Sequence, residues 1–179
     1  MGLIIEESGM KFGEYQDCQV FHIERSEQYI NGLRQNGIKT CEFILQRGSK
    51  LFFIEAKSSC PRKSMKDIPI SEREKRKKSY DDFIQEIILK MRHALSLYGN
   101  ILLKRYSQKD LPPNMAVPDL SDSRIYLVLV INPPEGSWEP EPELQDDLRK
   151  ACREVMKIWK INSLAVINEE MARKKHFIL

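Results

Sequence analysis

Three side chains that could act together in catalysis lie close together in the sequence: Glu42, Glu55 and Lys57. Carboxylate oxygens are hard ligands that suit Mg²⁺, an ion that keeps several of its waters when a protein binds it. A bound Mg²⁺ lowers the pKa of such a water and polarises a phosphoryl group, and a nearby lysine adds a second positive charge. These residue types therefore suit hydrolysis of a phosphodiester bond, with Mg²⁺ or Mn²⁺ as the cofactor.

A β-hairpin is expected to bring the three residues together. Two apolar runs, Cys41–Gln46 and Leu51–Ala56, flank a polar step with Gly48 and Ser49 at its centre. Strand-favouring residues on both sides of a Gly-Ser tip are typical of a hairpin.

The hairpin register determines which side chains face each other. A turn centred on the Gly-Ser pair places Glu42 opposite Glu55, with Cβ atoms about 4.5–5.5 Å apart. Lys57 lies two residues beyond Glu55 and therefore shares its face of the sheet. Like charges directly opposite each other are unfavourable in a sheet. A bound divalent cation would relieve the repulsion, and so would water at a solvated strand end.

Hydrophobic periodicity and turn residues indicate the other elements. Strands are predicted at 3–7, 10–15, 18–24, 124–132 and 163–167, and helices at 27–35, 71–98 and 143–160. The segment 124–132 is the most apolar part of the chain and is typical of a central strand covered on both faces. The long helix before it can serve as a crossover, so this strand is expected to join the hairpin in parallel. The predicted fold class is α/β, with a central mixed sheet flanked by helices.

Composition limits the class of protein. A chain of 179 residues, 41% hydrophobic and 31% charged, suits a single globular domain over residues 1–179. No apolar run is long enough for a membrane helix, and the N-terminus lacks the basic and apolar regions of a signal peptide. The four cysteines are scattered, which predicts neither a disulfide framework nor a zinc site. A reducing, cytoplasmic setting and no membrane partner are expected.

The tripeptide Glu55-Ala56-Lys57, which ends an apolar strand and follows Glu42 by thirteen positions across a hairpin, resembles the PD-(D/E)XK nuclease superfamily. The order of hairpin, helix and buried strand is also that of its restriction-endonuclease-like core, here about residues 18–132, with 143–179 as a C-terminal helix–strand extension. The resemblance implies that Glu42, Glu55 and the carbonyl of Ala56 hold the metal. It also implies that Lys57 positions or activates the attacking water.

The chain departs from the superfamily pattern at several positions. The first acid is usually an aspartate after a proline, whereas Glu42 follows a cysteine. Many members add an acid from the helix before the hairpin, for which Glu24 and Glu27 are both candidates. Some members aim a polar side chain from the next helix at the site, and Gln85 is the candidate here.

The most basic part of the chain, residues 61–78, directly follows the hairpin. Basic side chains next to a phosphodiester-cleaving site suit contact with a nucleic-acid backbone, DNA more readily than RNA. The candidates are Arg62, Lys63, Lys66, Arg73, Arg76 and Lys77. The alternative is a solvated helix start in which these side chains pair with neighbouring acids.

Two other functions are compatible with the sequence. A catalytically inactive, nuclease-like binding or regulatory protein would suit the modest net charge of +3 and the acidic loop at 135–143. A cysteine nucleophile, Cys41 or Cys60 with His22, is the other, and no local signature supports it. A homodimer stays open as a further partner.

Overall fold

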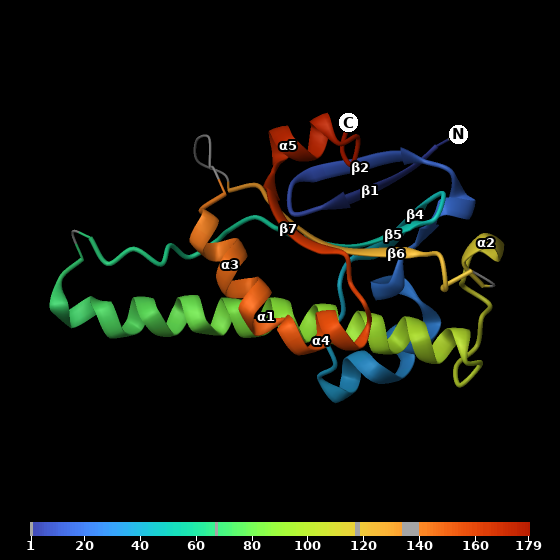
Figure 1. Cartoon of the computed structure of the whole chain (residues 1–179), viewed down its shortest axis with the longest axis horizontal. Coiled ribbons are helices and arrows are strands. Elements are labelled where there is room, and N and C mark those ends of the chain that lie inside the picture. The colour runs from blue at the N-terminus through green and yellow to red at the C-terminus, as the bar shows by residue number, and fades with distance from the viewer. Residues whose placement is uncertain (1, 67, 117–118, 134–139) are drawn as a thin grey trace.

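A five-stranded mixed sheet forms the centre of the computed structural model, which describes residues 2–66, 68–116, 119–133 and 140–179 (Figure 1). The strand order is β3-β4-β5-β6-β7. The bounds are Val20–Phe21 for β3, Phe43–Arg47 for β4, Lys50–Lys57 for β5, Arg124–Ile131 for β6 and Ser163–Asn168 for β7. The prediction of a mixed α/β fold with a central sheet is therefore confirmed.

The predicted hairpin is present in the predicted register. Strands β4 and β5 are antiparallel, and the pairs run from Arg47 opposite Lys50 to Phe43 opposite Ile54. Gly48 makes the tight turn with a φ of 56°, a left-handed conformation that glycine adopts without steric cost. The register alternates the side chains of β5 between the two faces of the sheet.

Strand β6 pairs with β5 in parallel, and β7 pairs with β6 in parallel. Successive residues of β6 enter opposite cores, with Leu127 and Leu129 on one face and Val128 and Val130 on the other. This strand is thus covered on both faces, as its continuous apolar run predicts.

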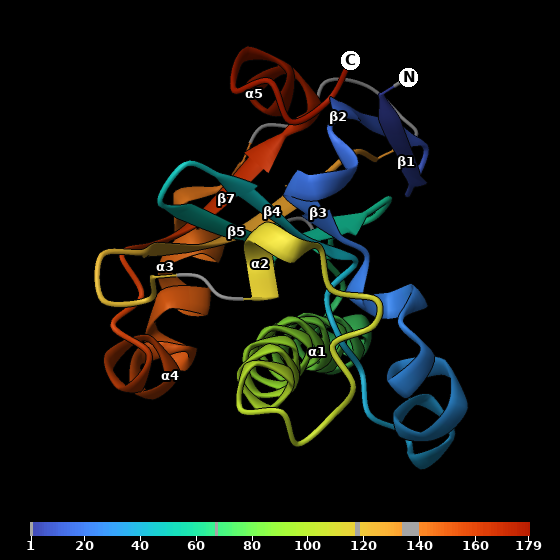
Figure 2. The ribbon, with the colours of Figure 1, turned by 90° about the vertical axis from the view of Figure 1, so that its right-hand side faces the viewer.

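The long helix α1, Ile70–Leu102, covers one face of the sheet and makes the crossover between β5 and β6 (Figure 2). Its first turns extend beyond the sheet (Figure 1). The helix continues four residues past its predicted end, through Gly99. A Cβ on Gly99 would lie 2.6 Å from the Trp159 ring. Close packing, rather than a kink, therefore accounts for this glycine.

The same face is also covered by α3, Pro142–Ala151, and α4, Arg153–Ile158, which replace the single helix predicted at 143–160. Their apolar residues join those of α1 in one core. Side chains of α3 also protect the edge strand β7: Gln145 accepts from the Val166 amide and Arg149 donates to the Leu164 carbonyl. A paired edge is not open to a further strand.

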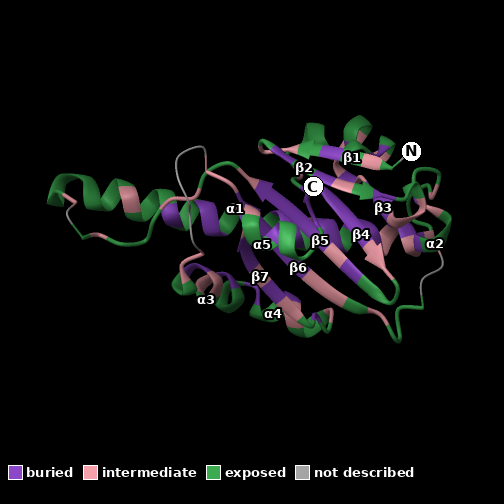
Figure 3. Ribbon diagram, turned by 90° about the horizontal axis from the view of Figure 1, so that it is seen from above, coloured by how far each residue is buried: buried purple, intermediate pink, exposed green. Residues whose placement is uncertain are grey.

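The opposite face carries the N-terminal hairpin of β1, Leu3–Glu7, and β2, Met10–Tyr15, together with α5, Glu169–Lys174 (Figures 1 and 2). These elements and the second face of the sheet enclose a separate apolar core. Figure 3 shows that burial is deepest where β4, β5 and β6 pass beneath them. One end of β1 is thereby held near the start of β4.

The segment between β2 and β4 is less regular than predicted. The strand expected at 18–24 is limited to Val20–Phe21, and Ile23–Arg25 forms a 3-10 turn. The Ser26 hydroxyl donates to the Ile23 carbonyl over 2.7 Å, a local bond that competes with strand pairing. The helix expected at 27–35 is present as a continuous helical segment over residues 27–36, but it is irregular: Tyr29–Leu33 is π-helical and Arg34–Asn36 is 3-10.

A short helix, α2, spans Pro113–Ala116 within the connection to β6. Across the described ranges, no helix combines the length and the apolar run that crossing a bilayer requires.

Candidate functional site

Glu42 and Glu55 lie on the face of the sheet that α1 covers. Glu42 immediately precedes β4, and its amide donates over 3.0 Å to the carbonyl of Ile54, the residue already opposite Phe43, so the regular ladder ends before Glu42. Its exposed fraction is 6%, and that of Glu55 is 0%. Two buried carboxylates at neighbouring strand ends are unfavourable unless positive charge or a proton compensates them.

Two lysines supply that positive charge. Lys90 of α1 places its Nζ 2.7 Å from Glu55 Oε1 and 3.4 Å from Glu42 Oε1. Lys57 lies at the end of β5, with its Nζ 3.5 Å from Glu55 Oε1 and 2.7 Å from Glu86 Oε1. Glu86 and Lys90 are one turn apart on the same face of α1, so the helix contributes one acid and one base to the site.

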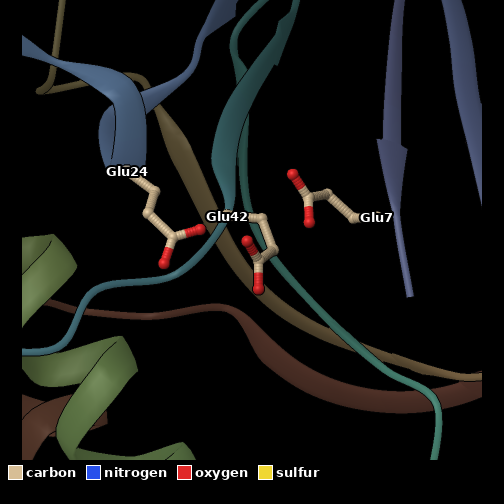
Figure 4. Close-up of side chains that lie close together, drawn as sticks. All are labelled: Glu7, Glu24 and Glu42. Atoms are coloured by element: carbon tan, nitrogen blue, oxygen red, sulfur yellow. The ribbon is translucent and has the colours of Figure 1, made fainter.

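Two further acids join Glu42 from the N-terminal region. Carboxylate oxygens of Glu7, at the end of β1, Glu24, in the 3-10 turn, and Glu42 all lie within 4.8 Å of one another. Figure 4 shows the three side chains reaching a common space from separate elements. Glu7 also has two basic neighbours: His22 Nε2 is 3.8 Å and Arg25 Nη2 is 3.6 Å from its Oε1.

Burial favours the protonated forms of Glu42 and Glu55. Burial, a hydrogen bond with Glu24 and the charge of Glu55 raise the pKa of Glu42. Burial raises the pKa of Glu55 to about 7, although Lys90 opposes the shift. Burial acts against the charge of Lys90, but the carboxylates of Glu55 and Glu42 outweigh it and raise the Lys90 pKa. A group of acids this costly to ionise suits a position where a cation binds.

One atom of the site has no partner. Glu55 Oε2 is buried and, among the described residues, accepts no hydrogen bond. An unsatisfied buried carboxylate oxygen is costly, and a cation would satisfy it. Glu55 is not one of the three acids whose oxygens lie within 4.8 Å of one another, and Lys90 Nζ is what links it to Glu42. Carboxylate oxygens, together with the Ala56 carbonyl next in the chain, are hard ligands of the kind that suit Mg²⁺ or Mn²⁺. The residues present therefore fit a divalent cation.

The sequence offered Glu24 and Glu27 as candidates for the accessory acid and Gln85 as the polar residue of the helix, and the structure shows which of them lie near the site. Glu24 lies in the acid cluster, whereas Glu27 is exposed, with its Oε2 3.8 Å from Lys109 Nζ. Gln85 is exposed on α1. The positions on that helix that reach the site are Glu86 and Lys90.

Sequence reasoning missed Glu7, Glu86 and Lys90. Lys90 could have been found from the sequence, because it interrupts the stripe of apolar residues by which α1 packs on the sheet. The other members of this stripe are buried: Phe83, Ile87, Ala94 and Leu97. A lysine in such a stripe needs a buried partner. Glu7 carried no comparable signal, since its approach depends on how the N-terminal hairpin packs.

The predicted basic residues lie on the part of the molecule that extends beyond the sheet, and several make contacts within it. Lys63 pairs with Asp147 of α3 over 2.7 Å, and Arg76 Nε donates to the Arg62 carbonyl over 3.2 Å. Arg73 Nε donates to the Ile68 carbonyl over 3.0 Å. Lys66 and Lys77 are exposed.

A groove of about 440 Å³ runs between this region and the site. Its lining residues are Ser59, Pro61, Lys75, Lys78, Ser79, Asp82, Phe83 and Glu86. Glu86 also holds Lys57, so the groove adjoins the acid and lysine cluster. The basic side chains that line it, Lys75 and Lys78, are not among those selected from the sequence.

The cysteine alternative has little support from the thiols themselves. Burial raises the pKa of Cys41 well above its usual value and that of Cys60 to about 12. A nucleophilic cysteine needs a depressed pKa. Burial also lowers the pKa of His22 to about 4. The acidic loop at 135–143 falls largely outside the described residues.

Comparison of the whole chain with models of protein families, with curated proteins and with solved structures finds no match.

Proposed function

We propose that this protein is a divalent-metal-dependent phosphodiesterase with a PD-(D/E)XK nuclease-like core, acting on nucleic acid and on DNA in preference to RNA. The observation that carries the proposal is the convergence of Glu7, Glu24 and Glu42, with Glu55 joined to Glu42 through Lys90 and with the tripeptide lysine beside Glu55. Acids gathered from separate elements at a cost in stability are typical of a functional site rather than of a structural core.

In this proposal Glu42, Glu55 and the Ala56 carbonyl hold the metal, with Glu24 and Glu7 as further carboxylates. A bound Mg²⁺ or Mn²⁺ supplies a polarised phosphoryl group and a water of lowered pKa. Lys57, with 21% of its side chain exposed, can donate a hydrogen bond to that water or to a phosphate oxygen. In the metal-free protein its ion pair with Glu86 holds the ammonium beside Glu55.

The test is a cleavage assay on single-stranded and double-stranded DNA and on RNA. We expect cleavage with Mg²⁺ or Mn²⁺ and none after chelation, because the carboxylates cannot polarise phosphate themselves. Product ends are read on a denaturing gel. Calorimetry with Mn²⁺ tests metal binding independently, and a chain that neither binds Mn²⁺ nor cleaves any of these substrates would refute the proposal.

Lys75 and Lys78 are expected to hold the substrate backbone in the groove. Reversing both charges (Lys75→Glu with Lys78→Glu) should weaken DNA binding by about tenfold or more and reduce the salt slope by about 1.8, at 0.9 for each lost contact with a duplex phosphate. Fluorescence anisotropy in EDTA measures binding without cleavage.

The matched control for the groove is Lys150→Glu with Lys157→Glu, which makes the same charge change at exposed positions of α3 and α4. Equal weakening by both double variants would mean that overall charge, and not the groove, attracts DNA.

The alternative is a non-catalytic nuclease-like binding protein. The observation in its favour is that Lys90 already neutralises part of the charge of Glu42 and Glu55 without a metal. DNA binding that depends on the groove, with no Mn²⁺ binding and no cleavage, would favour this alternative.

A further inference from the structure

Lys90 is buried in a position where the α1 stripe otherwise buries apolar side chains. Its exposed fraction is 8%, and it lies between Ile87 and Ala94 in the stripe that packs on the sheet. A lysine is almost never buried unless it is paired. Hydrophobic contact would be better served by leucine here, so the ammonium group itself needs an explanation.

The ammonium lies between the two acids proposed to share the metal. Its Nζ is 2.7 Å from Glu55 Oε1 and 3.4 Å from Glu42 Oε1. A divalent cation held by both carboxylates would compete for the same oxygens and would repel the ammonium across a buried, weakly screened space. Full occupation of both positions is therefore unfavourable.

We propose that Lys90 is a built-in counter-ion that holds Glu42 and Glu55 together in the metal-free protein and is displaced when a divalent cation binds. This inference rests on the proposed function, because it assumes that the site binds a metal. The lysine stem is long and flexible, so the ammonium can leave the carboxylates while α1 stays in place. Glu86, one turn earlier on the same face, offers it an alternative carboxylate.

Displacement has a consequence for the neighbouring lysine. Glu86 currently accepts from Lys57 over 2.7 Å. If Lys90 moves to Glu86, the two ammonium groups share one carboxylate, and Lys57 is released in part towards the groove. Metal binding would thus prepare Lys57 to meet a phosphate.

The decisive experiment follows the side-chain ammonium signals of lysine by NMR in the full-length wild-type chain during titration with Mg²⁺. We expect the Lys90 signal, assigned with Lys90→Arg, to shift or to be lost as Mg²⁺ binds. The signal of Lys63, which pairs with Asp147 away from the acids, should stay unchanged. A Lys90 signal that does not move while calorimetry shows Mg²⁺ binding would overturn this inference and leave the proposed function standing. Absence of binding of both Mg²⁺ and Mn²⁺, together with absence of cleavage, would overturn both.

A second measurement uses thermal unfolding of Lys90→Met. Removal of the counter-ion leaves two buried acids facing each other, so the metal-free variant should melt lower than the wild type. Saturating Mg²⁺ should raise the midpoint of this variant by more than it raises that of the wild type or of the control Lys63→Met. Equal Mg²⁺-induced shifts in all three would count against displacement. If Lys90→Met does not fold, the wild-type titration decides.

Discussion

Replacement of Lys57 by methionine is expected to lower the cleavage rate by about 10²–10⁴-fold, the range for loss of a positioned proton-transfer or charge-stabilising group. The fold should persist, because Lys90 remains 2.7 Å from Glu55 and the methionine retains most of the length of the side chain. The measurement is the single-turnover cleavage rate at saturating Mn²⁺, together with the circular dichroism spectrum of the variant.

The matched control is Lys50→Met, at the opposite end of the same strand, where the side chain is exposed. This control should cleave at the wild-type rate. Lys57→Arg should recover part of the activity if a positive charge is what the reaction needs. Unchanged cleavage in Lys57→Met would remove Lys57 from the proposed mechanism while leaving the metal ligands untouched.

The second large effect concerns stability. Glu42→Gln should make the metal-free protein more stable at pH 8, by about 1–3 kcal/mol, since each pKa unit corresponds to about 1.4 kcal/mol. The amide keeps the shape of the side chain but removes a buried negative charge beside Glu24 and Glu55. Lys90 retains Glu55 as its closer partner. The same variant should lose Mn²⁺ binding, a trade between stability and function.

The sign of the pH dependence follows from the direction of the pKa shifts. The pKa of Glu42 and that of Glu55, about 7, are raised in the folded state above the ordinary value of 4.5, mainly by burial. The folded state therefore holds these protons more tightly, and stability is lost as the pH rises from about 5, through 7 for Glu55 and on to about 9 for Glu42. The difference between Glu42→Gln and the wild type should be small at pH 5 and much larger at pH 8.

Thermal and urea unfolding in EDTA at both pH values measure this difference. Saturating Mg²⁺ should stabilise the wild type at pH 8 and leave Glu42→Gln unchanged, because the variant lacks one of the ligands. A variant less stable than the wild type at pH 8 would show that the Glu42–Lys90 contact stabilises the fold by more than the clustered acids destabilise it.

Local patterns determined the part of the site that lies on the hairpin. The Gly-Ser tip and the two-residue period of a strand are properties of adjacent residues, so they predict the register of the hairpin and that Lys57 shares the face of Glu55. The predicted pair of Glu42 with Glu55 lies one step beyond the last pair of the ladder, Phe43 opposite Ile54. The continuous apolar run at 124–132 likewise predicts a strand covered on both faces. These elements form as expected.

Local patterns were less successful between residues 18 and 36. The apolar alternation at 18–24 predicts a longer strand than the one present, because β4 begins at Phe43 and offers β3 only the partners Leu45 and Ile44. The helix predicted at 27–35 is present over residues 27–36, but most of it has π and 3-10 hydrogen bonding, in a segment where Asn31 and Gly32 have low helix propensity. At 18–24, the short pairing with β4 and the hydrogen bond from Ser26 to the Ile23 carbonyl outweighed the apolar alternation.

Tertiary structure decided which residues complete the site. The rotation of α1 about its axis selects Glu86 and Lys90 rather than Gln85, and the packing of the N-terminal hairpin brings Glu7 to Glu24 and Glu42. Both depend on contacts between segments that are far apart in the chain, which no short-range periodicity encodes. The sequence by itself thus determined the hairpin that brings Glu55 and Lys57 to one face next to Glu42. The fold decided that Lys90 lies between Glu42 and Glu55, and that Glu7 and Glu24 approach Glu42.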